Sequence, residues 1–195
     1  MATNGERERL RLFVALDLPQ DVREALLAWR SVVVRQVPEL RLVAQEALHA
    51  TLCFLGSQPA EDAKKIAGAC ETALSGASCP ELDLQAGLWL PPRRPRVLGV
   101  RLDDSSGALG RIQGAVSTSL SDEGWYTPEK RPFLPHVTVA RVPSRTRVRP
   151  AELPPLHSLR FRAPAVTLYR SRLQRSGARY EPLASIALNY RGRAA

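Results

Sequence analysis

One short pattern, a histidine followed two positions later by a threonine within an apolar segment, occurs once in each half of this 195-residue chain. The first copy lies in LHATLCFLG, residues 48–56, and the second in PHVTVARVP, residues 135–143. Side chains on a β-strand alternate between its two faces. Each segment therefore predicts a strand that buries aliphatic side chains on one face and presents an imidazole beside a hydroxyl on the other.

Strict alternation assigns the side chains of both strands to faces. In the first strand it predicts a polar face that carries His49, Thr51 and Cys53, and in the second a polar face that carries His136 and Thr138. The opposite faces are aliphatic and suit a core: Leu48, Ala50, Leu52, Val137 and Val139. Although these two strands are remote in the sequence, both can pack their aliphatic faces against the core of one domain.

The rest of the chain predicts an α+β fold. Helical spacing of apolar residues predicts three helices, at 19–33, 57–76 and 109–124. Apolar alternation predicts the strands, at 10–16, 48–55, 81–90, 96–102, 135–142, 161–173 and 178–188. No linker divides the chain, so residues 10–190 are expected to form a single domain. The polar segments 1–9 and 191–195 are expected to be flexible tails.

Composition and charge restrict the class of binding partner and the cellular compartment. The net charge of +9 fits a surface that attracts polyanions such as RNA, although an arginine-rich composition can equally serve solubility alone. Three cysteines, Cys53, Cys70 and Cys79, have no paired spacing and indicate free thiols in a reducing compartment. There is no secretory signal and no apolar run long enough to span a bilayer. These features predict a cytoplasmic protein that does not enter a membrane.

Two imidazoles beside hydroxyls suit acid–base chemistry at a phosphate. A neutral ring can accept a proton and a protonated ring can donate one, while threonine hydroxyls bind phosphate oxygens. Cys53 is roughly 13 Å from His49 along one strand, too far for a Cys–His pair. A metal would need a third protein ligand, and His157 in PPLHSL reads as a surface or packing residue. The alternative for the motifs is two half-buried structural histidines with threonines that favour strands.

Together these segments resemble the two-histidine (2H) phosphoesterase superfamily. The motifs His49-Ala50-Thr51-Leu52 and His136-Val137-Thr138-Val139 match its paired HxTx pattern. The context at LRLFVALDLP, PPRRPRVLGV, KRPFLPHVTVAR and LYRSRLQRSGARYEPL is similar to bacterial and archaeal RNA 2′,3′-cyclic phosphodiesterases, also described as 2′-5′ RNA ligases. The resemblance runs from about residue 10 to 184.

The resemblance implies a bilobal fold, with two antiparallel sheets and outer helices around a central cleft. It also implies metal-independent hydrolysis of RNA 2′,3′-cyclic phosphate ends to 2′-phosphomonoesters. We further expect a monomer that needs no cofactor. Reversible 2′-5′ RNA ligation is an alternative, because the same acid–base pair serves both directions. A module that binds RNA or a nucleotide without turnover and a basic ribosome-associated protein are further alternatives.

The resemblance also implies residue roles. His49 would be the proton donor to the leaving 3′ oxygen and His136 the proton acceptor from water, while Thr51 and Thr138 would hold the phosphate. The family's arginine after the second motif corresponds to Arg141. Strict alternation turns Arg141 away from His136, so its role requires the strand to end or bulge there. Candidates for stacking on a base are Phe54, Tyr126 and Phe133, and the alternative for each is a place in the core.

Overall fold

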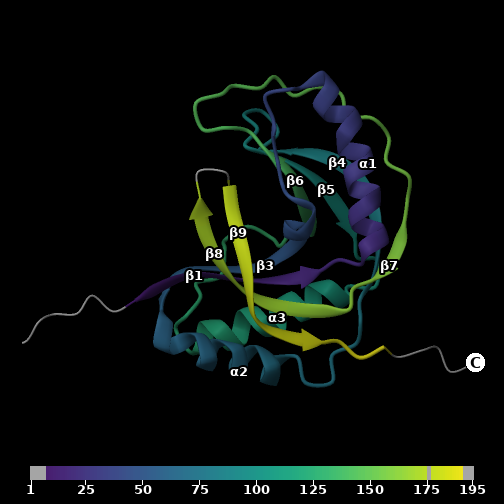
Figure 1. Ribbon diagram of the computed structural model, residues 1–195. Coiled ribbons are helices and arrows are strands. Elements are labelled where there is room, and N and C mark those ends of the chain that lie inside the picture. The colour runs from purple at the N-terminus through teal and green to yellow at the C-terminus, as the bar shows by residue number, and fades with distance from the viewer. Residues whose placement is uncertain (1–7, 175–176, 191–195) are drawn as a thin grey trace, which may run out of the picture.

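The computed structural model of the chain describes residues 8–174 and 177–190, and its elements are labelled in Figure 1. The helices are α1 (Gln20–Gln36), α2 (Ala63–Ala73) and α3 (Ala108–Asp122), with 3-10 turns at Gln45–Ala47 and Ala60–Asp62. The strands are β1 (Arg9–Asp17), β2 (Arg41–Leu42), β3 (His49–Pro59), β4 (Glu81–Leu90), β5 (Val97–Asp103), β6 (His136–Arg141), β7 (Arg160–Arg162), β8 (Ala165–Gln174) and β9 (Gly177–Ala187). The predicted α+β class is confirmed.

All nine strands belong to one sheet, which is antiparallel throughout. Its order is β7-β4-β5-β6-β3-β1-β8-β9, and β2 pairs with β6 beside this path. The two expected sheets are therefore the two halves of a continuous sheet. They meet where β3 and β6 pair at a single position, Ala50 with Val137. In Figure 1 the half that contains β4, β5 and β6 lies above the half that contains β1, β3 and β8, with this narrow junction between them.

The helices cover the outer faces of the two halves. Helix α1 packs on the half that contains β4, β5 and β6, whereas α2 and α3 pack on the half that contains β1, β3 and β8 (Figure 1). Helix α1 buries the apolar residues Val22, Leu26, Trp29 and Val33, and α3 buries Leu109, Ile112, Val116 and Leu120. Since α1 follows β1 yet covers the other half, the two lobes are interwoven along the chain.

Several element boundaries differ from expectation. The strand predicted at 161–173 is in fact two strands, β7 at one edge of the sheet beside β4 and β8 beside β1. Ser57–Pro59, predicted as the start of a helix, instead extend β3 and pair with β1, and α2 begins only at Ala63. Pro59 accounts for this, because the residue before a proline disfavours helical backbone angles. Arg9, placed in the predicted N-terminal tail, begins β1, and the tail residues 1–7 and 191–195 lie outside the described residues.

Two further expectations concerned the state of the cysteines and membrane-spanning segments. Cys53 and Cys70 are buried and Cys79 is partly buried, and all three are free thiols as predicted. Across the described ranges, no helix combines the length and the apolar character needed to cross a membrane.

Candidate active site

The structure brings the two histidine–threonine motifs together at the junction between the halves of the sheet. Ala50 and Val137, the paired residues of β3 and β6, are fully buried and point into the core. Paired residues share a face, and their immediate neighbours point to the opposite one. The four motif side chains therefore lie on the cleft side of the junction: His49, Thr51, His136 and Thr138.

Both imidazoles are held by the same local hydrogen bond. Nδ1 of His49 lies 2.8 Å from the carbonyl oxygen of Ala47, and Nδ1 of His136 lies 2.8 Å from that of Leu134. A carbonyl oxygen only accepts, so Nδ1 carries the proton in each ring. Nε2 is then the nitrogen left to exchange a proton with a ligand. For His49, Nε2 lies 3.2 Å from the hydroxyl oxygen of Thr51.

His49 is neutral in the unliganded protein at neutral pH. Burial is the main cause that lowers its pKa to about 4, and the charges of Arg141, Arg23 and His136 lower it further. The hydrogen bond to the Ala47 carbonyl acts in the opposite direction. With Nδ1 protonated, Nε2 of the neutral ring accepts the hydroxyl hydrogen of Thr51. The ring therefore needs an anion nearby before it can act as an acid.

Aromatic side chains that the sequence did not single out enclose His49. Ring centroids lie 4.9 Å away for Phe13, 5.2 Å for Tyr180 and 6.1 Å for Tyr169. The hydroxyl of Tyr169 donates to Asp17 at 2.7 Å, which fixes this wall against the end of β1. Phe13 was detectable in principle, since alternation in LRLFVALD places it opposite the core-facing leucines.

Two bulges in β3 overturn the strict alternation predicted for the first motif. Opposite β1, Ala15 pairs with Thr51 and Val14 with Cys53, so Leu52 is an extra residue. Cys53 consequently points into the core, where it is 1% exposed, and its predicted position beside Thr51 is wrong. Burial also raises the pKa of the Cys53 thiol to about 12, which makes it a poor nucleophile.

The second bulge of β3 turns Phe54 into the cleft. Phe13 pairs with Phe54 and Leu12 with Gly56, so Leu55 is the extra residue. Phe54 thus shares the face of Phe13 and Thr51, and it is 43% exposed. Tyr126 and Phe133, the other predicted stacking residues, pack against the core and do not line the pocket at the motifs.

A bulge in β6 turns Arg141 toward the side of the sheet that carries His136 and Thr138. Gly99 of β5 pairs with Thr138, and Leu98 pairs with Ala140, so Val139 is the extra residue. Arg141 pairs with Val97 and thereby returns to the face of Thr138. The predicted need for a bulge is met.

Arg30 of α1 holds this bulge from the core side. Its side chain is only 9% exposed, and its guanidinium donates to the backbone oxygens of Val43 and, at 3.1 Å, Val139. The amide of Val43 donates to the same Val139 oxygen at 3.1 Å. Sequence analysis missed Arg30, because a single arginine on an apolar helix face gives no indication of which carbonyl it reaches.

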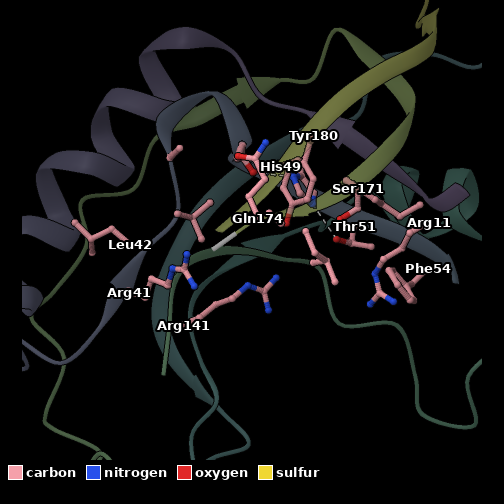
Figure 2. Close-up of a pocket in the computed structure, with 16 residues that line it drawn as sticks. Arg11, Arg41, Leu42, His49, Thr51, Phe54, Arg141, Ser171, Gln174 and Tyr180 are labelled. Carbon is pink, nitrogen blue, oxygen red and sulfur yellow. Dashed lines mark hydrogen bonds between the residues drawn. The ribbon is translucent and has the colours of Figure 1, made fainter. Parts of the chain in front are cut away.

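A pocket of about 460 Å³ lies at the first motif, within the range of small-molecule sites. Figure 2 shows His49, Thr51 and Tyr180 near its middle, with Arg41 and Arg141 on one side and Arg11 and Phe54 on the other. Arg41 and Arg141 occupy paired positions of β2 and β6, which makes that side cationic.

His136 and Thr138 adjoin this pocket without lining it. Both are partly buried, and the residues that line the pocket include His49 and Thr51 of the first motif but not His136 or Thr138. His136 lies beside Gly99, where a Cβ atom would come within 3.4 Å of the His136 ring and 3.2 Å of the Val137 carbonyl oxygen. His157 is exposed and lies outside the pocket, as predicted for a surface residue. Within residues 8–174 and 177–190, no three His, Cys, Asp or Glu side chains gather as metal ligands would.

Comparisons with known proteins identify relatives over most of the chain. The family model described as the 2′-5′ RNA ligase superfamily matches residues 18–175. The RNA 2′,3′-cyclic phosphodiesterase of Escherichia coli (strain K12) is 33% identical over 182 residues, which cover 93% of this chain and 98% of that protein.

Solved structures have the same architecture. A crystal structure of a Thermus thermophilus protein superposes with a TM-score of 0.75 at 26% identity, covering 94% of this chain and all of the other. The structure of Escherichia coli LigT complexed with 3′-AMP superposes with a TM-score of 0.73 at 30% identity, covering 93% of this chain and 99% of the other.

Proposed function

The chain belongs to the 2′-5′ RNA ligase superfamily, and from that membership we propose that it hydrolyses RNA 2′,3′-cyclic phosphate ends to 2′-phosphomonoesters without a metal ion. One observation carries the proposal. Two His-x-Thr motifs, 87 residues apart by their histidine numbers, point to the same side of the sheet at the single residue pair that joins its halves. A binding protein has no need of two such proton-exchanging groups.

The proposed reaction uses each motif residue for one task. The hydroxyls of Thr51 and Thr138 and the guanidinium of Arg141 bind the non-bridging phosphate oxygens. His136 accepts a proton from water as the water oxygen bonds to phosphorus. The bond from phosphorus to the 3′ oxygen breaks, and His49 donates its Nε2 proton to that oxygen. His49 ends neutral and His136 ends protonated, and solvent restores both.

The low pKa of His49 is compatible with a donor role once substrate is bound. The cations near His49 lower its pKa in the empty site. A phosphodiester between the two rings carries a negative charge, which offsets those cations and raises the pKa. Substrate binding therefore loads the proton that the 3′ oxygen later receives.

The direct test is turnover of 2′,3′-cyclic AMP in the presence of EDTA, followed by chromatography of the product. We expect 2′-AMP from the wild type, and losses of at least about a thousandfold in kcat for His49→Ala and His136→Ala. His157→Ala is the matched control, because His157 is exposed and outside the pocket. It should leave kcat unchanged.

Two outcomes would contradict the proposal. Turnover that survives both active-site substitutions would show that other groups carry the chemistry. Tight binding of the nucleotide by a wild-type protein that forms no product would show a binding module.

We also propose that the protein acts on RNA in the cytoplasm as a monomer. Three free thiols support a reducing compartment, and the net charge of +9 supports a polyanionic partner. Sedimentation equilibrium tests the monomer, and a dimer at micromolar concentration would refute it.

A further inference from the structure

We propose that two arginine-rich loops outside the pocket bind the backbone of a base-paired RNA stem next to the reacting end. The loops are residues 91–96, between β4 and β5, and residues 142–149, after β6. Together these loops form the arginine surface. The inference rests on the proposed function and extends it, because it assigns a partner to a region that the proposed reaction does not use.

The charges of the arginine surface are all of one sign. Its two loops contain no aspartate or glutamate, and they contain six arginines: Arg93, Arg94, Arg96, Arg145, Arg147 and Arg149. All six are exposed. Other arginines pair with carboxylates, as Arg162 does with Glu81. In the part of the chain that the structure describes, none of the six has an ion pair. Their mutual repulsion is therefore left for a bound polyanion to relieve.

Hydrogen bonds hold the two loops together. The guanidinium of Arg96 donates to the carbonyl oxygen of Ser144 at 3.1 Å, and the amide of Val142 donates to the carbonyl oxygen of Arg96 at 2.9 Å. Just beyond the second loop, the indole of Trp89 donates to the carbonyl oxygen of Ala151 at 2.9 Å. The second loop is thus held at both ends. A surface that is fixed in advance loses less conformational entropy when it binds a ligand.

Buried residues between the arginines direct the guanidinium groups outward. Along residues 145–149 the arginines are exposed, whereas the residues between them are partly buried, and Val148 packs against the core. In the first loop, Pro95 is buried between the exposed Arg94 and Arg96. The buried residues anchor the backbone, and the cations face solvent on the outside of both loops.

The arginine surface continues the cationic side of the pocket. Arg141 lines the pocket, pairs with Val97 of β5, and is followed directly by the second loop. Val97 in turn directly follows the first loop. An RNA whose end lies at His49 can therefore pass Arg141 and reach the arginine surface. Neither loop has an exposed large apolar side chain of the kind that inserts into a membrane, so RNA fits this surface better than a lipid bilayer does.

The side chains of the arginine surface favour a paired stem over an unpaired strand. Proteins that bind unpaired strands combine cations with aromatic side chains on which bases stack. The two loops contain cations but no aromatic residue. They therefore fit a ligand that presents phosphates and hides its bases. A stem is such a ligand, and its two strands place more phosphates within reach of the cations than one strand does.

The test compares two RNAs of equal length that end in a 2′-phosphate, a stem-loop with a short unpaired 3′ end and an oligouridylate. By fluorescence anisotropy at about 0.1 M salt, we expect the wild type to bind the stem-loop about tenfold more tightly, the effect of roughly one additional phosphate contact. The triple variant Arg145→Gln, Arg147→Gln and Arg149→Gln should weaken stem-loop binding between about ten- and a hundredfold. It should also lower the slope of log affinity against log salt concentration by about 2 to 3.

The matched control removes three positive charges from exposed positions outside the arginine surface, with the substitutions Arg111→Gln, Arg160→Gln and Arg172→Gln. Both triple variants have the same net charge, so only the location of the lost charges differs. The control should keep stem-loop affinity within about threefold of the wild type. An equal loss of affinity in the two triple variants would show a diffuse effect of net charge and overturn the inference.

Turnover separates this inference from the proposed function. The triple variant of the second loop should keep the wild-type kcat on 2′,3′-cyclic AMP, because none of its three residues lines the pocket. If the wild type forms no product but the same variant still loses stem-loop binding, the arginine surface stands and the proposed function fails. Oligouridylate bound as tightly as the stem-loop would overturn the inference, as would tighter binding of vesicles of phosphatidylserine and phosphatidylcholine than of either RNA.

Discussion

Replacing Arg30 with methionine should lower activity although Arg30 lies on α1, behind the sheet. Its guanidinium donates to the oxygens of Val43 and Val139, and Val139 is the extra residue of the bulge in β6. Methionine retains much of the apolar stem but cannot donate. Without the donor, the bulge loses a constraint that keeps Arg141 on the cleft face.

The magnitude follows from what each carbonyl loses. The Val139 oxygen keeps the hydrogen bond from the Val43 amide, whereas the Val43 oxygen loses its bond to Arg30. A hydrogen bond to a charged group contributes about 2 kcal/mol, and removal of a buried cation returns part of that. We expect the free energy of unfolding to fall by about 1–2 kcal/mol. We expect kcat/KM to fall between about ten- and a hundredfold, the cost of a misplaced phosphate contact.

The assay is a double-mutant cycle between Arg30→Met and Arg141→Ala, read as kcat/KM for 2′,3′-cyclic AMP. Because Arg30 acts through Arg141, Arg30→Met should have almost no further effect in the Arg141→Ala background. Arg35→Met, an exposed arginine on the same helix, is the control and should change neither activity nor stability. Full additivity of the two substitutions would refute the reasoning, as would unchanged activity in a destabilised Arg30→Met protein.

Three further predictions concern the two histidines. Because His49 must be protonated to donate and its pKa in the empty site is lowered to about 4, kcat/KM should decline as the pH rises above neutrality; a value that stays constant up to pH 9 would contradict this. Because folding lowers the pKa of His49, its imidazole is protonated in the unfolded chain but not in the folded protein between about pH 4 and 6.5. The free energy of unfolding should therefore fall as the pH drops from 6.5 to 4, and His49→Gln should reduce this fall by about 3 kcal/mol in urea titrations. Gly99→Ala places a methyl group 3.4 Å from the His136 ring, so kcat should fall while circular dichroism shows an intact fold; an unchanged kcat would show that His136 is not confined there.

The sequence predicted those features that depend on local periodicity. Alternation and helical spacing located the strands of both motifs and the buried stripes of α1 and α3, since each face is set within one element. The meeting of the two remote motifs was implied by the resemblance to the two-histidine phosphoesterases. Even there, the sequence could not show that a single pair, Ala50 with Val137, joins the halves of the sheet.

The β-bulges determine those side-chain positions that the sequence could not predict. The position of an extra residue in a strand depends on hydrogen bonding to the partner strand, so the local sequence does not predict it. Hence Cys53 was placed on the wrong face, Phe54 could not be distinguished from Tyr126 and Phe133, and Arg141 was left conditional on a bulge. Arg30 was undetectable for the same reason, because its partners lie on β6 and in the segment before β3.

The central claim is that both imidazoles act on one phosphate, and a crystal structure of the protein with 2′-AMP tests it most directly. We predict phosphate oxygens within about 3.2 Å of Nε2 of both His49 and His136, with a threonine hydroxyl bound on each side. A phosphate that contacts only one of the two rings, or a nucleotide bound elsewhere on the sheet, would contradict the account.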